Sequence, residues 1–440
     1  MQVKSRRLAA SALLLAVLFG TRAASTETYK AAETFDAVFK IVKDSHFDPA
    51  FDVAKWDQVG AELRPKAIEA RTAGEFRGVL ADMLGRLGLS HFGVIPSTPD
   101  NPGDHLNLNG QPGFDVRLID RQLVVSSVDP DGGAAAAGVH AGWIVQTIGG
   151  TAVSTLLAGI PEGTPPRLAH VQAWRLAVTR LRGPSDTSAE IAFVDGTGAT
   201  VTKSIERRHE QGQPVTVGSL PTMYVRVASS LKPTPAGGTA GVVGFNVWMT
   251  AVDAEFQKAM DRFRSADGIV IDLRGNPGGL AAMITGIAGH FVNERATLGV
   301  MKTKQSEMKF PANPRLVNAA GERVEPYKGP VAILVDGMTG SASECFSGGL
   351  QSLGRARVFG QTSMGQALPA LFDQLPNGDV LIHAWGDFVT GTGVRIEGRG
   401  VIPDEPVALT RAGLLAGRDA TLDGALSWID RVRKESRNSK

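Results

Sequence analysis

The chain has 440 residues, of which 43% are hydrophobic and 20% charged, and its formal net charge at pH 7 is +2. At about 150 residues per domain this length predicts about three domains, enough to bury a core without metals. The near-neutral charge, with no basic stripe, argues against a nucleic-acid partner. The single cysteine, Cys345, excludes an internal disulfide.

Residues 1–23 have the layout of a secretory signal peptide. Three basic residues precede an apolar run from Leu8 to Phe19, and small residues follow near Ala23. A membrane-spanning helix needs about 18 or more apolar residues, so a cleaved signal is the favoured interpretation. We therefore expect a periplasmic or secreted protein whose mature form has no membrane span.

Residues 24–105 are predicted to form an N-terminal helical domain. Thr72 and Glu75 have the spacing of a capping box at a helix start. Ser90 and His91 follow the end of that helix, and a turn-rich stretch then places a domain boundary near residue 105. Apolar residues recur at helical spacing on one earlier stripe, which comprises Phe35, Val38, Phe39 and Val42.

Residues 106–208 are predicted to form a β-rich domain with short strands. They resemble a PDZ domain of exported bacterial proteases in the run Gly113-Phe114-Asp115-Val116 and in the segment 136–150. The resemblance implies that the backbone at Gly113 and Phe114 binds a peptide carboxylate. Trp143 departs from the Asp usual in such domains, and a scaffold domain that binds no peptide is the alternative.

Residues 209–440 are predicted to form an α/β core. Near-continuous apolar runs occupy 241–247, 268–273 and 331–336, and a helical pattern covers 252–263. Apolar runs that alternate with helices are typical of buried strands in a layered α/β structure. We expect the third run to lead directly into a helix near residue 341.

The helix start at 341–344 is the first candidate for chemistry. Ser341 and Glu344 satisfy the capping-box pattern, so both have a structural use. Ser343 has no such use, and in the first turn its Oγ would lie near the positive end of the helix dipole. A second candidate is the glycine-rich turn 274–279, whose backbone N–H groups are accessible but which alone indicates only a turn.

These two segments, together with 360–365 and 398–404, resemble the C-terminal processing and tricorn-core serine peptidases over about residues 30 to 408. The resemblance implies an exported serine endopeptidase that acts on peptides or unfolded proteins without a cofactor. It implies a layered ββα core of the crotonase/ClpP-like kind, with an N-terminal helical segment and an inserted PDZ domain. The nucleophile would be Ser343, and the oxyanion-hole donors would be the N–H groups of Glu344 and of Gly278 or Gly279.

One departure distinguishes two catalytic branches of this family. The processing branch uses a Ser-Lys dyad, but the corresponding segment here carries Gln366, whose neutral amide cannot act as a base. The tricorn-like branch uses a His, an adjacent Ser and a Glu. The resemblance therefore implies His91 as general base, with Ser90 and Glu397 orienting it.

Several alternatives compete with this hypothesis. His91 has the position of a helix-dipole partner, and Glu397 lies between Arg395 and Arg399 in a charge cluster. His383, on an alternating strand pattern, is a rival base. A non-catalytic relative that binds a hydrophobic ligand or a partner protein is the alternative function. The scattered histidines argue against a metal site, and Cys345 is expected to point into the core. The oligomeric state stays open.

Overall fold

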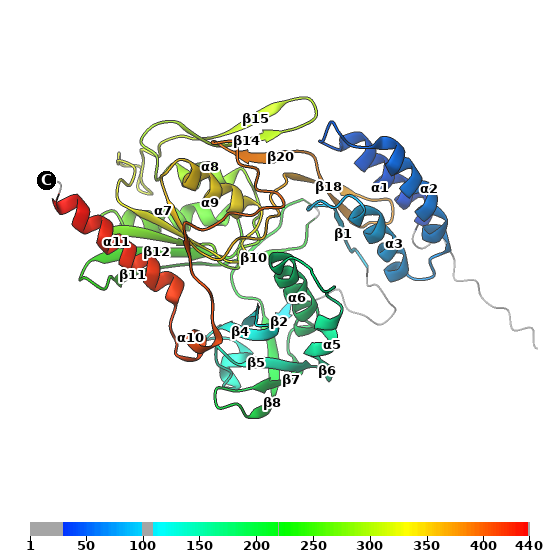
Figure 1. The fold of residues 1–440 in the computed structure, drawn as a ribbon, viewed down its shortest axis with the longest axis horizontal. Helices are drawn as coiled ribbons and strands as arrows, with labels where there is room; N and C mark the ends of the chain where they lie inside the picture. The colour runs from blue at the N-terminus through cyan, green and yellow to red at the C-terminus, as the bar shows by residue number, and fades with distance from the viewer. Residues whose placement is uncertain (1–29, 99–108, 219, 439–440) are drawn as a thin grey trace, which may run out of the picture.

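The computed structural model describes residues 30–98, 109–218 and 220–438. The predicted signal peptide and the boundary near residue 105 lie outside these residues. A search of the described part for a helix long and apolar enough to cross a membrane finds none. The architecture is mixed α/β with N-terminal helices and several sheets, as expected (Figure 1).

Three N-terminal helices, α1 (Ala31–Ser45), α2 (Val53–Glu69) and α3 (Ala73–Gly85), share one apolar core. Thr72 Oγ1 accepts a hydrogen bond from Glu75 N at 3.1 Å, which confirms the predicted start of α3. Beyond α3, strand β1 (Gly93–Ile95) pairs antiparallel with β19 (Val380–Ala384), which pairs in turn with β18 (Ala370–Gln374). This sheet fixes the segment around His91 against the C-terminal half of the chain.

Residues 110–209 form the inserted β unit, a separate lobe below the core in Figure 1. Its sheet has the order β2-β8-β7-β5-β4-β3, so β3 is an edge strand, and β6 pairs with β5. The buried faces of β3, β4 and β7 pack against one side of helix α6. The strands are β2 (Gly110–Gln111), β3 (Phe114–Ile119), β4 (Gln122–Val128), β5 (Ile144–Ile148), β6 (Thr151–Ala152), β7 (Thr187–Val194) and β8 (Thr200–His209), and the helices are α4 (Gly133–Ala136), α5 (Val153–Ala158) and α6 (Pro166–Leu181).

The core contains a six-stranded sheet of order β11-β12-β13-β16-β17-β21, parallel except for β11. The three predicted apolar runs are its strands β12, β13 and β16. A two-stranded pair, β9 and β10, precedes this sheet. The strands are β9 (Gln213–Val215), β10 (Met223–Val225), β11 (Val227–Pro233), β12 (Thr239–Phe245), β13 (Gly268–Asp272), β16 (Val331–Val335), β17 (Arg357–Gly360) and β21 (Glu405–Pro406).

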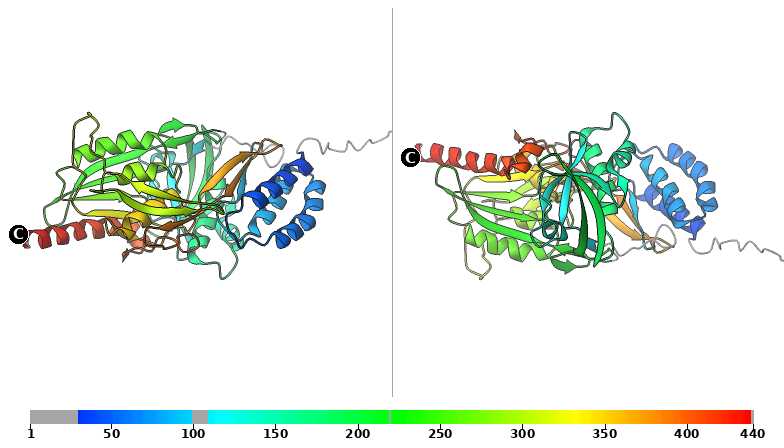
Figure 2. Two further views of the ribbon diagram at one scale, coloured as in Figure 1. Left: turned by 90° about the horizontal axis from the view of Figure 1, so that it is seen from above. Right: turned by 90° about the horizontal axis from the view of Figure 1, so that it is seen from below.

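Helices cover both faces of this sheet, which explains why its strands are apolar on both sides. Ile271 and Ile333 point into the larger core with α7 (Ala251–Arg262) and α9 (Ala342–Ser352), whereas Leu334 points to α11 (Ala420–Asn438). Figure 2 shows α11 running along one side of the core. A further sheet, β15-β14-β20, packs on α9. The remaining elements are α8 (Met283–Ala288), β14 (Ala296–Lys302), β15 (Glu307–Ala312), β20 (Asp387–Thr390) and α10 (Arg411–Leu415).

Candidate active site

A sharp turn between β16 and α9 presents Ser341. Ser341 is the N-cap of α9, and its φ of 52° is in the left-handed region. Such a backbone costs a non-glycine residue about 1–3 kcal/mol and persists only where the surroundings hold it. Its N–H is held by two acceptors, Gln366 O at 2.9 Å and Glu344 Oε2 at 3.1 Å. Strained backbone of this kind clusters at active sites.

The Ser341 hydroxyl faces the imidazole of His91. Ser341 Oγ lies 3.3 Å from His91 Nε2, and the other ring nitrogen, Nδ1, lies 2.8 Å from Ser90 Oγ. Ser90 in turn donates its hydroxyl hydrogen to Glu397 Oε2 and its backbone N–H to Glu397 Oε1, both at 2.9 Å. Segments far apart in the sequence therefore form one hydrogen-bonded chain, Glu397–Ser90–His91–Ser341.

This chain determines the tautomer of His91. The single hydroxyl hydrogen of Ser90 is given to Glu397, so Ser90 Oγ can only accept from the ring. The hydrogen of the neutral imidazole therefore lies on Nδ1, and the Nε2 lone pair faces Ser341. This is the arrangement that a general base requires for taking a proton from a hydroxyl.

The surroundings of His91 keep it neutral. Burial lowers the pKa of His91 to about 4, and the positive charge of Arg175 on α6 acts in the same direction. At neutral pH the imidazole is therefore unprotonated and able to accept a proton. Arg175 is a contributor that the sequence pattern does not reveal, because it comes from the inserted β unit.

The structure does not bring Ser343 to His91, which corrects the expected pairing. The Ser343 side chain is fully buried, and its Oγ accepts a hydrogen bond from Trp248 Nε1 at 2.8 Å. Ser343 lies inside the helix and points into the core, whereas Ser341, at the N-cap with a non-helical φ, points to His91. Ser341, to which the sequence assigns only a capping role, is the serine that meets the base.

Two of the expected oxyanion-hole donors are already engaged, which is a second correction. Glu344 N–H donates to Ser341 O at 2.9 Å, and Gly278 N–H donates to Asn276 Oδ1 at 2.9 Å. Both donors are therefore unavailable to a substrate in this structure. The remaining expected donor is the N–H of Gly279.

Gly279 and Ala342 supply the backbone N–H groups without a partner beside Ser341. Within residues 30–98, 109–218 and 220–438, neither N–H makes a hydrogen bond. The glycine turn lies directly against the serine, because a Cβ on Gly278 would come within 2.5 Å of Ser341 Cβ and 3.0 Å of Ala342 N. Two free donors next to a hydroxyl are what a developing oxyanion needs.

Comparison with known proteins finds two matching family models. Residues 239–407 match the model of peptidase family S41, and residues 28–85 match the tricorn protease C1 domain. Over residues 239–407 the chain is therefore similar to peptidase family S41. A carboxyl-terminal-processing protease of Synechocystis sp. is 26% identical over 234 residues, which are 52% of this chain and 50% of that protein. The chain thus spans about half the length of this curated relative.

Solved structures share the fold of this chain. A photosystem II D1 C-terminal processing protease has a TM-score of 0.56 at 21% identity, over 89% of this chain and 98% of the other. Mature CPAF has a TM-score of 0.60 at 14% identity, over 93% and 97%. At these identities the likeness concerns the fold alone.

The rival base and the cysteine lie away from Ser341 and His91. His383 on β19 is buried, with Nδ1 at 3.0 Å from Ser45 Oγ and Nε2 at 2.7 Å from Asp373 Oδ2. Cys345 points into the core as expected, and burial raises the pKa of its thiol. No cluster of His, Cys, Asp or Glu able to hold a metal ion occurs in the described part of the chain.

The expected carboxylate-binding residues lie at the start of edge strand β3. Gly113 has a φ of 81°, and a Cβ there would come within 2.6 Å of Gly132 Cα, so only glycine fits. Phe114 opens β3 itself. Farther along this edge, side chains bond to the Val116 backbone: Asp115 Oδ1 accepts its N–H at 2.8 Å, and Arg117 Nη1 donates to its carbonyl at 2.9 Å.

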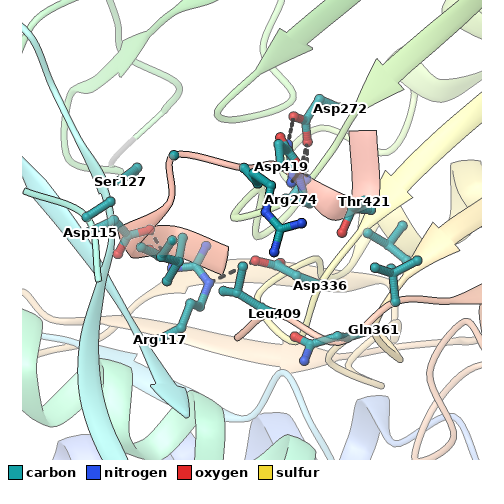
Figure 3. Close-up of a pocket in the computed structure, with 18 residues that line it drawn as sticks. Asp115, Arg117, Ser127, Asp272, Arg274, Asp336, Gln361, Leu409, Asp419 and Thr421 are labelled. Atoms are coloured by element: carbon teal, nitrogen blue, oxygen red, sulfur yellow. Dashed lines mark hydrogen bonds and ion pairs between the residues drawn. The ribbon is translucent and has the colours of Figure 1, made fainter. Parts of the chain in front are cut away.

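A cavity of about 460 Å³ separates β3 from the core, as Figure 3 shows. Neither Ser341 nor His91 lines it. Arg117 Nε donates across this boundary to Asp336 Oδ2 at 2.8 Å. The other oxygen of Asp336 accepts from Gly275 N at 2.9 Å. Asp336 therefore connects the inserted β unit with both turns that flank Ser341.

Proposed function

We propose that this protein is an exported serine endopeptidase in which Ser341 is the nucleophile and His91 the general base. The chain Glu397–Ser90–His91–Ser341 is the observation that carries the proposal. A serine at hydrogen-bond reach of a base, itself oriented by a third group, is the recurring arrangement of covalent acyl transfer. The Ser-His-Glu set with an adjacent Ser is that of the tricorn-like branch.

The reaction proceeds in two acyl transfers. Ser341 Oγ gives its proton to His91 Nε2 and attacks the scissile carbonyl carbon, while the N–H groups of Gly279 and Ala342 receive the oxyanion. His91 then donates the proton to the leaving amine, and the peptide bond breaks to leave an acyl-enzyme on Ser341. Water, deprotonated by His91, hydrolyses this ester and restores the serine.

Glu397 and Ser90 stabilise the cationic form of His91 during both transfers. As the imidazole gains a proton, its Nδ1–H bond to Ser90 strengthens, and Ser90 passes the interaction to the carboxylate of Glu397. His91 is partly buried and has no direct carboxylate partner, which explains its low resting pKa. Its protonation is favoured only while the oxyanion is present nearby.

The relatives and the N-terminal sequence support a proposal for the substrate class and the location. A processing protease among the relatives supports peptides or unfolded proteins as substrates. The inserted β unit is proposed as a PDZ domain that binds or gates such peptides, since β3 is an edge strand beside Gly113 and Phe114. The pattern of residues 1–23 supports export to the periplasm or beyond.

A fluorophosphonate probe tests the proposal. The folded protein is incubated with the probe, and the adduct is located by peptide mass mapping. We expect the label on Ser341, its loss in Ser341→Ala and His91→Ala, and its retention in Ser352→Ala, a control at the far end of the same helix, where Ser352 Oγ bonds only to Gly349 O. A folded protein that takes no label on Ser341 refutes the proposal and favours the non-catalytic, ligand-binding alternative.

A further inference from the structure

Glu344 places a buried carboxylate directly behind Ser341. Its side chain is fully buried, and all four of its hydrogen-bond partners are donors. Oε1 accepts from the Ser363 hydroxyl and from Gly365 N at 2.7 Å. Oε2 accepts from Gln366 N at 2.9 Å and from Ser341 N at 3.1 Å. A helix cap needs only the last of these contacts, so the other three require a different explanation.

Residues 363–367, here called the splint, connect the nucleophile with the group that orients the base. The backbone N–H groups of Gly365 and Gln366 donate to Glu344. The next backbone N–H, that of Ala367, donates to Glu397 Oε2 at 2.9 Å. That Glu397 oxygen also accepts the Ser90 hydroxyl. The carbonyl of Gln366 accepts Ser341 N–H, so the splint touches both ends of the catalytic chain.

We propose that Glu344 is a positioning residue, whose ionised carboxylate holds the splint against Ser341 and so sets the approach of Ser341 Oγ to His91 Nε2. This inference rests on the proposed function. In the Ser-Lys branch this segment supplies the base, whereas here its side chain at 366 is neutral. The segment acts through its backbone instead, and Glu344 is the residue that holds it.

The donor-only surroundings favour the ionised form of Glu344. A protonated carboxyl would need an acceptor, but Ser363 Oγ already accepts from Val401 N at 2.7 Å and gives its hydrogen to Glu344. No cation is among the four partners. Other titratable groups nearby are the Cys345 thiol on the same helix, Glu397 across the splint and His91 beyond Ser341. A cation also contacts the splint, because Arg167 on α6 donates to Met364 O at 3.0 Å, but it makes no hydrogen bond to Glu344.

Burial makes this ionisation sensitive to pH. It raises the pKa of Glu344 to about 7, against the effect of the four hydrogen bonds. The pKa of His91 is about 4, so acidification neutralises Glu344 before it protonates the base. Activity should therefore fall below about pH 7 because the splint is released, not because His91 is lost.

The test compares Glu344→Gln with a matched control, Asp430→Asn. Asp430 on α11 is also buried and also accepts a hydroxyl and a backbone N–H, from Thr234 at 2.6 Å and Ala236 at 2.7 Å, but it lies outside the site. The readouts are the maximal fluorophosphonate labelling rate and the half-saturating probe concentration across pH. For Glu344→Gln we expect a maximal rate about a hundredfold lower, the loss expected of a small misplacement, at a similar half-saturating concentration. In this variant the fall in labelling rate on the acid side of pH 7, here called the acid limb, should disappear. Asp430→Asn should keep the natural maximal rate and the acid limb.

A second variant covers the case in which Glu344→Gln does not fold. Ser363→Ala removes one donor to the ionised carboxylate, which raises the pKa of Glu344 further. Its acid limb should move above pH 7. An acid limb that stays in place in Ser363→Ala, or that persists in a folded Glu344→Gln, overturns the inference.

Hydrogen–deuterium exchange separates this inference from the proposed function. Peptides that cover the splint should exchange faster in Glu344→Gln and in Ser363→Ala than in the natural sequence, a readout that needs no turnover. Unchanged exchange overturns the holding role of Glu344. Faster exchange in a protein whose Ser341 takes no label would instead refute the peptidase function and leave the structural role of Glu344 standing.

Discussion

The pair Ser341 and Ser343 offers the sharpest test of the site, since only one of them can be the nucleophile. Replacing Ser343 with Ala removes the acceptor of the Trp248 Nε1 hydrogen bond and nothing in the chain Glu397–Ser90–His91–Ser341. We expect Ser343→Ala to lose stability and to keep its activity. Ser341→Ala should keep its stability and lose its activity.

The size of the effect follows from burial. Trp248 and Ser343 are both fully buried, so the truncation leaves an indole N–H without an acceptor and without access to water. An unsatisfied buried donor costs about 1–3 kcal/mol. For a cooperative unit of 150–250 residues each kcal/mol corresponds to roughly 2–4 °C in Tm. The Tm of Ser343→Ala should therefore fall by several degrees.

Thermal unfolding and fluorophosphonate labelling of both variants provide the assay. The expected outcome is a lowered Tm with labelling at Ser341 for Ser343→Ala, and little change in Tm with no labelling for Ser341→Ala. A folded Ser343→Ala that takes no label, together with a labelled Ser341→Ala, would show that the assignment of the nucleophile from the geometry is mistaken.

Two further variants examine the neighbourhood of Ser341. Asp336→Asn removes a buried charge that pairs with Arg117. We expect the free energy of unfolding, measured by chemical denaturation, to fall by roughly 3 kcal/mol. This is the lower end of the range for such pairs, because Asp115 still contacts Arg117. Gln366→Ala should leave the labelling rate within about twofold of the natural protein, because the contacts of Gln366 with the site are made by its backbone; a large loss would show that its side chain takes part.

Local patterns in the sequence carry enough information to predict the elements that position the site. Apolar runs predict β12, β13 and β16, and the Thr72–Glu75 spacing predicts the start of α3. Local patterns do not connect Ser90, His91 and Glu397, and only the resemblance to a family brings them into one hypothesis. In the structure Ser90 joins the other two, because its hydroxyl contacts both His91 Nδ1 and Glu397 Oε2.

The choice between the two serines depends on information that spacing does not contain. The pattern of Ser341 and Glu344 identifies a helix cap and says nothing of the φ of Ser341, which directs its hydroxyl away from the helix and toward His91. A cap and a nucleophile are compatible roles. Likewise, which N–H groups remain free is decided by tertiary partners, such as Asn276 for Gly278, that no local pattern specifies.

The two perturbed groups of the site make opposite contributions to stability as pH changes. The pKa of Glu344 rises from 4.5 to about 7 on folding, so between these values the folded state holds a proton that the unfolded state lacks, and stability falls as pH rises. The pKa of His91 falls from 6.5 to about 4, so the unfolded state holds the extra proton and stability rises with pH. Each slope is about 1.4 kcal/mol per pH unit, and between about pH 4.5 and 6.5 they nearly cancel.

Replacing either Glu344 or His91 should therefore reveal the contribution of the other residue to the pH dependence of stability. In Glu344→Gln only the His91 contribution remains, and the free energy of unfolding should increase from pH 5 to pH 6 by about 1.4 kcal/mol more than in the natural protein. In His91→Ala the difference should have the opposite sign. Denaturant titrations at the two pH values measure both changes, and all other titrating groups cancel in the comparison. Parallel pH dependences in the three proteins would mean that neither group is perturbed by its burial at the site.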